Sequence, residues 1–226
     1  MSVTSEKSRR RGHSAHARAD RARQLRIIAG AWRGRRLRFP ASDAIRPTPD
    51  RVRETLFNWL AGRIAGARCL DLFAGSGALG LEALSRGAAQ VCFVEQDGVA
   101  ARALDAVLVE WGARGAQVVR TEALQFLRGA PQTFDIVFLD PPFGSELLAT
   151  AARLLESHAW LASEAMIYVE CSARETLPSL PPPWTVVRAK AAGEVGYHLL
   201  SRSALPSGQK APQATFCNPI RESDAE

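Results

Sequence analysis

The sequence predicts an α/β domain with a doubly wound, mainly parallel seven-stranded sheet of Rossmann-like type. Short apolar runs alternate with stretches of helical periodicity from Cys69 to Val169, and a glycine-rich turn follows the first run. This alternation is typical of a parallel sheet covered by helices on both faces. After Pro181-Pro182-Pro183, two further apolar runs follow with no helix between them. They predict a terminal antiparallel hairpin on the same sheet.

The strands and helices of this domain can be assigned by residue range. Strands are expected at residues 69–73, 91–94, 117–119, 136–139, 166–169, 184–187 and 196–200. Helices are expected at residues 78–86, 99–111, 124–127 and 147–155. The fourth strand of a doubly wound sheet lies beside the first, so strand 136–139 should neighbour strand 69–73.

A small N-terminal β-hairpin extension is predicted before the sheet. Residues 26–32 and 35–39 mix apolar and basic side chains on either side of a short Arg-Gly turn. Two such runs around a turn are typical of a hairpin. Its apolar side chains, Trp32, Leu37 and Phe39, are expected to pack inward.

A helix is expected to follow the hairpin, with Thr48 as its N-cap, Pro49 at its first position and apolar residues continuing to Leu60. The chain then divides into four expected segments: a disordered basic tail at 1–24, a hairpin-and-helix extension at 25–60, the α/β domain at 61–202 and a disordered tail at 203–226. The two tails are too poor in apolar side chains to fold by themselves.

Positive charge is concentrated at the N-terminal end of the chain. Residues 1–53 carry 15 basic and 4 acidic residues, a net charge of +11, whereas the remainder carries 14 basic and 19 acidic residues, a net charge of −5. Such an excess at one end indicates a phosphate-binding arm on an ordinary domain, or else a solvated charged tail.

Composition excludes several other classes of protein. No apolar run approaches the roughly 18 residues needed to span a bilayer, and no signal peptide is recognisable, so a cytoplasmic protein without membrane contact is expected. The cysteines have no C-x-x-C spacing and are expected to be reduced thiols: Cys69, Cys92, Cys171 and Cys217. The four histidines show no ligand spacing, so no metal site is predicted.

The segment from Asp71 to Gly80 combines a strand end, a glycine-rich turn and a helix start. Gly75 and Gly77 allow the backbone to approach a ligand closely, and the helix N-terminus offers free N–H groups. Glu95, at the end of the next strand, is placed to accept the ribose hydroxyls of an adenosine. This spacing fits NAD as well as S-adenosylmethionine. Asp71 is a charge within an apolar strand, which a sulfonium ligand with an amino-acid moiety could compensate.

The motif Asp140-Pro141-Pro142-Phe143 favours S-adenosylmethionine, because it ends the fourth strand and should face the glycine turn. The Asp140 carboxylate and the Pro141 carbonyl could accept both N–H donors of an exocyclic base amine, which would make its lone pair available for methyl transfer. Phe143 offers a flat face on which an extruded base could stack. We interpret Asp140, Pro141 and Phe143 as the catalytic residues.

These motifs resemble the class I methyltransferases that modify exocyclic amines of bases. The flanking residues resemble more closely the bacterial 16S ribosomal RNA guanine-N2 methyltransferases, over about residues 26–202. The segments that carry the resemblance are 26–30, 32–35, 46–48, 51–60 and 80–87. The resemblance implies S-adenosylmethionine as cofactor, one guanine as substrate, and small ribosomal subunit particles as the natural target, with a monomeric enzyme expected. In this interpretation 25–60 is an RNA-binding extension and 61–202 the methyltransferase domain.

The site residues expected from the motifs and the resemblance fall into two further groups. The cofactor-binding group is Asp71, Phe73, Ala74, Gly75, Ser76, Gly77, Glu95, Gln96, Glu122, Ala123 and Asp140. The RNA-binding group is Arg26, Arg33, Arg35, Arg36, Arg38, Arg46 and Arg51. Glu122 departs from the wider class, which often has Asp at that strand end. An adenine-N6 methyltransferase, an NAD-dependent oxidoreductase and a non-enzymatic ribosome-binding factor remain alternatives.

Overall fold

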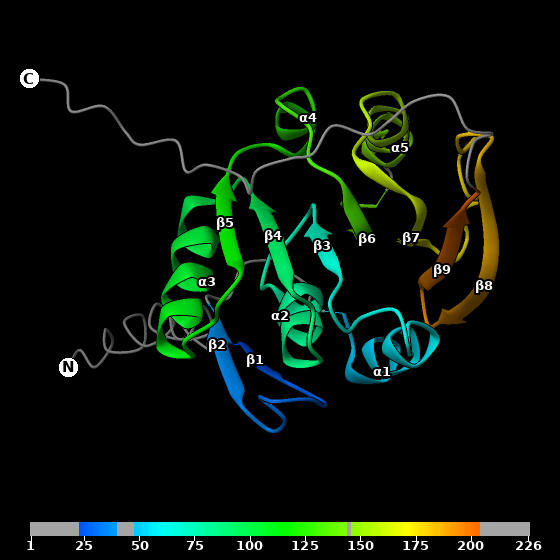
Figure 1. Cartoon of the computed structure of the whole chain (residues 1–226). Coiled ribbons are helices and arrows are strands. Elements are labelled where there is room, and N and C mark those ends of the chain that lie inside the picture. The colour runs from blue at the N-terminus through cyan, green and yellow to red at the C-terminus, as the bar shows by residue number, and fades with distance from the viewer. Residues whose placement is uncertain (1–22, 40–47, 144–145, 204–226) are drawn as a thin grey trace, which may run out of the picture.

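A computed structural model describes residues 23–39, 48–143 and 146–203, and a seven-stranded sheet forms its centre (Figure 1). The strands are β3 (Arg68–Asp71), β4 (Gln90–Glu95), β5 (Ala116–Arg120), β6 (Phe134–Leu139), β7 (Leu161–Ser172), β8 (Trp184–Ala192) and β9 (Val195–Arg202). Their order is β5-β4-β3-β6-β7-β9-β8. Strands β3 to β7 run parallel, and β9 is antiparallel to both of its neighbours. The doubly wound sheet, its terminal hairpin and the pairing of the first strand with the fourth are therefore confirmed.

Helices cover both faces of the sheet (Figure 1). They are α1 (Asp50–Trp59), α2 (Ala78–Ser85), α3 (Gly98–Glu110), α4 (Ala123–Leu127) and α5 (Leu147–Ser157). Alternate residues of each inner strand point to opposite sides, so Cys69 packs with α1, α2 and α3 while Leu70 packs with α4 and α5. Both sides are apolar because both are covered, which explains the continuous apolar runs in the sequence.

Several strand boundaries differ from the sequence-based prediction. The first strand of the sheet ends at Asp71 rather than at Phe73, because the chain turns there into the glycine-rich loop. Strands β7 and β8 are longer than expected. Their additional residues include exposed polar side chains such as Glu164, Arg188 and Lys190, which hydrophobic periodicity does not detect.

The N-terminal hairpin is present, but its first strand was predicted wrongly. It consists of β1 (Arg23–Arg26) and β2 (Arg36–Phe39), so most of the run 26–32 is a loop. The backbone N–H groups of Ile28 and Ala29 donate to the Glu82 carboxylate on α2, at 2.8 and 3.0 Å, instead of to a strand partner. The loop also fits closely against the end of α2, since a side chain at Gly30 would lie 1.8 Å from the Ser85 carbonyl oxygen.

Leu37 and Phe39 are buried as expected, and they belong to the same apolar cluster as the sheet and α1 to α3. Trp32 is only partly buried and packs edge-on against Trp111, with ring centroids 5.3 Å apart. The extension at 25–60 and the sheet therefore share one core.

Glu82 fixes this extension to the seven-stranded sheet. Its carboxylate is fully buried and pairs with Arg86 at 2.8 Å and with Arg53 at 3.4 Å. Arg53 is also fully buried and donates to the Arg26 carbonyl oxygen and to Asp50. A buried charge is tolerated only when it is paired and hydrogen-bonded, and here every charged member of the cluster has a partner.

The expected N-cap of α1 is also wrong. Pro49 occupies the cap position, and the helix begins at Asp50. Thr48 does not cap the helix, because its hydroxyl donates to Glu170 on β7 at 2.9 Å. This bond connects the residue before α1 with the carboxyl end of the parallel strands.

Other sequence predictions concern the two tails, the cysteines and the membrane. The tails at 1–24 and 203–226 lie outside the described ranges except for Arg23, Gln24 and Ser203. Cys69, Cys92 and Cys171 are buried thiols, and Cys217 lies outside the described residues. None of the helices within residues 23–39, 48–143 and 146–203 has the length and apolar character required to cross a bilayer.

Candidate active site

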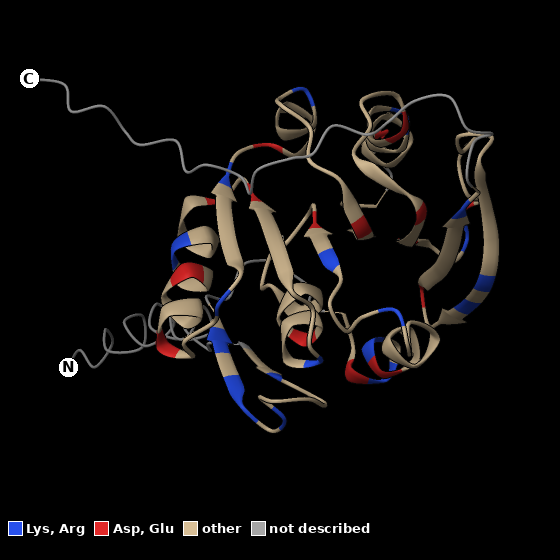
Figure 2. Cartoon of the chain, viewed as in Figure 1, with Lys and Arg blue, Asp and Glu red and all other residues tan. Residues whose placement is uncertain are grey.

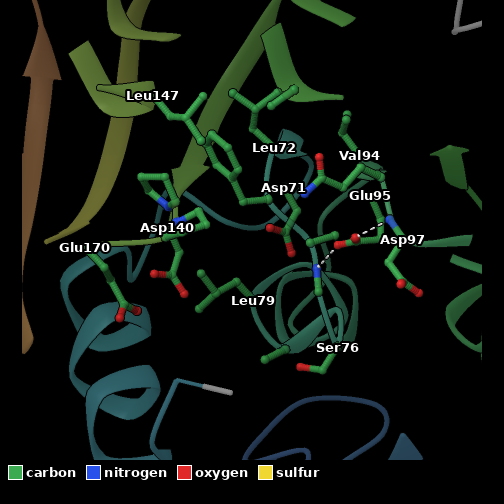
Figure 3. Close-up of a pocket in the computed structure, with 18 of the residues that line it drawn as sticks. Asp71, Leu72, Ser76, Leu79, Val94, Glu95, Asp97, Asp140, Leu147 and Glu170 are labelled. Carbon is green, nitrogen blue, oxygen red and sulfur yellow. Dashed lines mark hydrogen bonds between the residues drawn. The ribbon is translucent and has the colours of Figure 1, made fainter. Parts of the chain in front are cut away.

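The carboxyl ends of the parallel strands open into a cleft of about 1450 Å³ (Figure 3). Ligands of open α/β sheets bind at this edge, where the strand order reverses. The order reverses here between β3 and β6, which carry Asp71 and Asp140 at their ends. The cleft also contains the glycine loop, Glu95 at the end of β4, the residues after β5, and Glu170 near the end of β7.

The glycine loop requires its glycines for two different reasons. Gly75 and Gly77 have φ angles of +51° and +75°, which L side chains rarely adopt. Gly77 also lies against α3, because a side chain there would come within 2.5 Å of Leu104. A side chain at Gly80 would come within 2.2 Å of the Phe93 ring. Gly75 lines the cleft, whereas Gly77 is not among the lining residues.

Glu95 is held in position by backbone donors. Its Oε2 accepts from Gly75 N–H at 2.6 Å and its Oε1 from Asp97 N–H at 2.7 Å. Asp97 in turn caps α3 by accepting from Val99 and Ala100. Each carboxylate oxygen keeps a further lone pair, so the group can still accept hydroxyl donors in an orientation that is fixed beforehand.

Asp71 is a buried acid with little compensation. Its carboxylate accepts from Gly80 N–H at 3.0 Å, which is its only side-chain hydrogen bond in the described part of the chain. Burial raises the pKa of Asp71 to about 7; the Gly80 bond opposes this, while the charges of Glu95 and Glu170 add to it. The site therefore favours a positively charged or proton-donating ligand near Asp71.

The motif after β6 combines a partly buried acid with an exposed ring. Burial raises the pKa of Asp140 well above its ordinary value, and the neighbouring acids Glu170 and Asp71 raise it further. Pro141 is buried and Phe143 is 49% exposed. A large ring at this exposure offers a surface on which a flat ligand can stack.

Sequence analysis missed one buried acid in the cleft. Glu170 is buried and accepts hydrogen bonds from Thr48 and Tyr168. Burial raises the pKa of Glu170, and these two bonds oppose the rise. The signal was present in the sequence, because Glu170 follows the apolar run 166–169 just as Asp140 follows the run 136–139.

The remaining expected cofactor residues line the same cleft: Phe73, Ala74, Ser76, Gln96, Glu122 and Ala123. Glu122 is exposed and occupies the N-cap position of α4 without making a side-chain cap bond. In the described residues, no group of three or more His, Cys, Asp and Glu side chains is arranged to hold a metal ion.

The arginines expected to bind RNA are exposed and lie mostly on the hairpin (Figure 2). Those within the described ranges are Arg26, Arg33, Arg35, Arg36, Arg38 and Arg51. Arg35 also lies over the Trp111 ring, 5.5 Å from its centroid. Arg46 lies outside the described residues. Arg53 differs from all of these, because it is fully buried in the Glu82 cluster and cannot reach a phosphate.

The strand order and the glycine loop at the carboxyl edge define a class I methyltransferase fold. A putative methyltransferase solved in complex with SAH has this fold, with a TM-score of 0.60, 16% identity, and coverage of 74% of this chain and 54% of that one. A protein-family profile described as "Conserved hypothetical protein 95" matches residues 25–201, and the chain belongs to that family.

Relatives from Escherichia coli are similar over nearly their whole length. "Ribosomal RNA small subunit methyltransferase D" of strain K12 is 51% identical over 181 residues, covering 80% of this chain and 91% of the relative. A structure of a putative methyltransferase from Escherichia coli superposes with a TM-score of 0.75 at 51% identity, covering 80% of this chain and 99% of the other.

Proposed function

We propose that the protein transfers a methyl group from S-adenosylmethionine to the N2 amine of a guanine in the 16S RNA of small ribosomal subunits. The observation that carries this proposal is the position of Asp140, Pro141 and Phe143 across one cleft from the glycine loop and Glu95. The similarity to ribosomal RNA small subunit methyltransferase D supports the same reaction class and substrate.

The residues of the cleft fit S-adenosylmethionine. Glu95 is oriented by Gly75 and Asp97 so that its remaining lone pairs can accept ribose hydroxyls. The buried Asp71 carboxyl group, which accepts a hydrogen bond from Gly80, suits the positively charged sulfonium and α-ammonium groups of the cofactor. The loop backbone at Gly75, which lines the cleft, allows close contact with the cofactor. When bound, the cofactor supplies an electrophilic methyl group on sulfur.

Asp140 and Pro141 prepare the amine for transfer. The Asp140 carboxylate and the Pro141 carbonyl each accept one N–H of the exocyclic amine, which favours a pyramidal nitrogen with an available lone pair. N–H donors and a cationic ligand both stabilise the ionised form of Asp140, which offsets its raised pKa. Phe143 stacks on the base and holds it in place. After transfer the amine is cationic, and its proton leaves to Asp140 or to water.

The hairpin provides the contact with RNA in this proposal. Its exposed arginines lie outside the cleft, where they can neutralise phosphates while the target guanine enters the site. Residues 25–60 thus serve as the RNA-binding extension of a monomeric enzyme. A substrate within the small ribosomal subunit places the protein in the cytoplasm.

The direct test uses purified protein, methyl-labelled S-adenosylmethionine and small subunits from cells that lack the corresponding modification. Label should appear on N2 of one guanine in the 16S RNA. Label on adenine N6, or no label above that of an Asp140→Ala variant, would contradict the proposal.

A further inference from the structure

Glu170 lies beside Asp140 in the cleft, yet none of the steps described above uses it (Figure 3). The last paired residues of the two parallel strands are Leu139 on β6 and Val169 on β7, so the next residues, Asp140 and Glu170, lie level with each other. The charge of Glu170 is the largest electrostatic influence on Asp140. Two carboxyl groups therefore face the substrate end of the cleft together.

The Glu170 side chain is held so that one of its oxygens is left for a ligand. Thr48 and Tyr168 both donate to Oε1, at 2.9 and 2.8 Å. Within the described residues, no hydrogen bond engages Oε2. Tyr168 is fully buried, and burial together with the charge of Glu170 raises its pKa well above 10, so its hydroxyl remains a donor. The two donors therefore fix the orientation of the carboxyl group through Oε1 and leave Oε2 for a ligand.

A purely structural role does not require a carboxyl group at this position. An amide oxygen could accept the same two hydrogen bonds without the cost of burying an acid beside Asp71 and Asp140. The presence of Glu170 next to Asp140 is better explained by a ligand that presents another N–H donor besides the amine.

Guanine presents such a donor. Its N1–H lies next to the N2 amine on the same edge of the ring, whereas adenine has a lone pair at N1. We propose that Glu170 is a specificity-determining residue whose Oε2 accepts the N1–H of the guanine while Asp140 and Pro141 hold its N2 amine. Adenine would bring its N1 lone pair against this oxygen. Because adenine has no N2 amine, it would also leave the Asp140 carboxylate and the Pro141 carbonyl without a donor. This inference rests on the proposed function and adds the group that recognises the base.

The experiment compares guanine with 2-aminopurine, which keeps the N2 amine but has a lone pair at N1. Small subunits are reconstituted with 16S RNA that carries one or the other at the mapped target position. For the wild type, kcat/KM should be about 10- to 100-fold lower on 2-aminopurine, the range expected when a well-placed hydrogen bond to a base is removed.

Glu170→Gln should reduce this preference to about threefold or less, with guanine the substrate whose kcat/KM falls more. Thr48 and Tyr168 direct the amide oxygen toward themselves, so the amide N–H2 occupies the position of Oε2 and can donate to N1 of 2-aminopurine. Glu170→Asp keeps the acid and should keep the preference for guanine at a lower kcat/KM, even if Glu170→Gln folds poorly.

Two control variants separate recognition from structure. Glu164→Gln makes the same charge change on β7 at a side chain that is 76% exposed, and should leave the preference unchanged. Thr48→Val removes one support of Glu170 but not its Oε2, so the preference should persist. An unchanged preference in Glu170→Gln, or an equal reduction in Thr48→Val, would overturn the inference. Failure of the wild type to methylate guanine N2 at all would instead overturn the proposed function, and the inference with it.

Discussion

The cleft and the hairpin use charge in opposite ways. In the cleft, Asp71, Asp140 and Glu170 are acids whose pKa values are raised by burial, and each has few or fixed partners. On the hairpin, arginines such as Arg33 and Arg36 are exposed to water. Buried charge gives strong, short-range selection of a small ligand, whereas exposed charge gives long-range attraction that salt screens. Under the proposed function, the cleft would carry out the chemistry and the hairpin would capture the RNA.

The largest effect is expected from Asp140→Ala. Removal of the acceptor aimed at the reacting amine should lower kcat on small subunits by about 100-fold or more. The effect should be independent of salt, since the group acts inside the cleft, and cofactor affinity should change much less. Asp105→Ala, at an exposed position on α3, provides the control. Near-normal turnover of Asp140→Ala would show that amine activation is assigned to the wrong residue.

Glu95→Ala should weaken S-adenosylmethionine binding by about 10- to 100-fold, because hydrogen bonds to a charged group contribute roughly 1.5–3 kcal/mol. Calorimetry or thermal shift measures this effect directly. In the wild type, the cofactor or its demethylated product should raise the melting temperature and NAD should not. Equal stabilisation by NAD would favour an oxidoreductase and contradict the assignment of the cleft to S-adenosylmethionine.

The hairpin should respond to salt where the cleft does not. Changing Arg33, Arg35 and Arg36 together to Ala should weaken small-subunit binding and flatten its salt dependence, by a log-log slope of about 0.7–0.9 for each phosphate that is no longer neutralised. Cofactor affinity should be unchanged. Deletion of residues 1–20 should weaken binding less than the triple change. Unchanged affinity and an unchanged slope in the triple variant would mean that these arginines are only a solvated surface.

A further effect, on stability rather than on binding or turnover, is expected from the titration of Asp71. Because its pKa is raised from 3.8 to about 7 in the folded protein, the native state holds the proton more tightly than the unfolded chain. Its stabilising contribution is therefore complete below about pH 4 and disappears as pH rises toward 7. Relative to Asp71→Asn, the ligand-free wild type should lose about 1–4 kcal/mol of unfolding free energy between about pH 5 and pH 8. A parallel pH dependence of the two proteins would contradict the assignment.

Cofactor affinity should change in the opposite direction across the same range. A cationic ligand favours the ionised form of Asp71, so binding of S-adenosylmethionine should strengthen as pH rises through about 7. The neutral thioether product should show a weaker pH dependence. These two titrations together distinguish a ligand-dependent charge from a purely structural acid.

The sheet could be predicted from the sequence because its inner strands are apolar on both faces and are separated by periodic helices. The acids at the ends of these strands followed from the same pattern, since parallel strands bring their carboxyl ends to one edge. What the pattern could not reveal were contacts between distant segments. Residues 27–32 look like a strand, but their N–H groups bind Glu82. Thr48 looks like a helix cap, but its hydroxyl binds Glu170.

Glu170 is a candidate functional residue for which sequence patterns also fail to show a contact with a distant segment. It ends an apolar run as the other acids do, but local sequence does not show that Thr48, 122 residues away, would direct its carboxyl group. Gly77 was expected from its motif to bind the cofactor, and the structure adds a contact that the motif does not show, since a side chain there would come within 2.5 Å of Leu104. Local sequence patterns identified these positions, but the contacts that each residue makes depend on distant segments of the chain.

The Glu82 cluster has a consequence for how this protein can be divided. A fragment beginning at residue 61 would lack Arg53 and the N–H groups of Ile28 and Ala29, so of the partners that Glu82 has among the described residues it would keep only Arg86. It would also expose the side of α2 that Gly30 covers. The N-terminal segment is therefore no interchangeable module, and a transplant of the hairpin would have to carry α2, which lines one side of the cleft with Ala78 and Leu79.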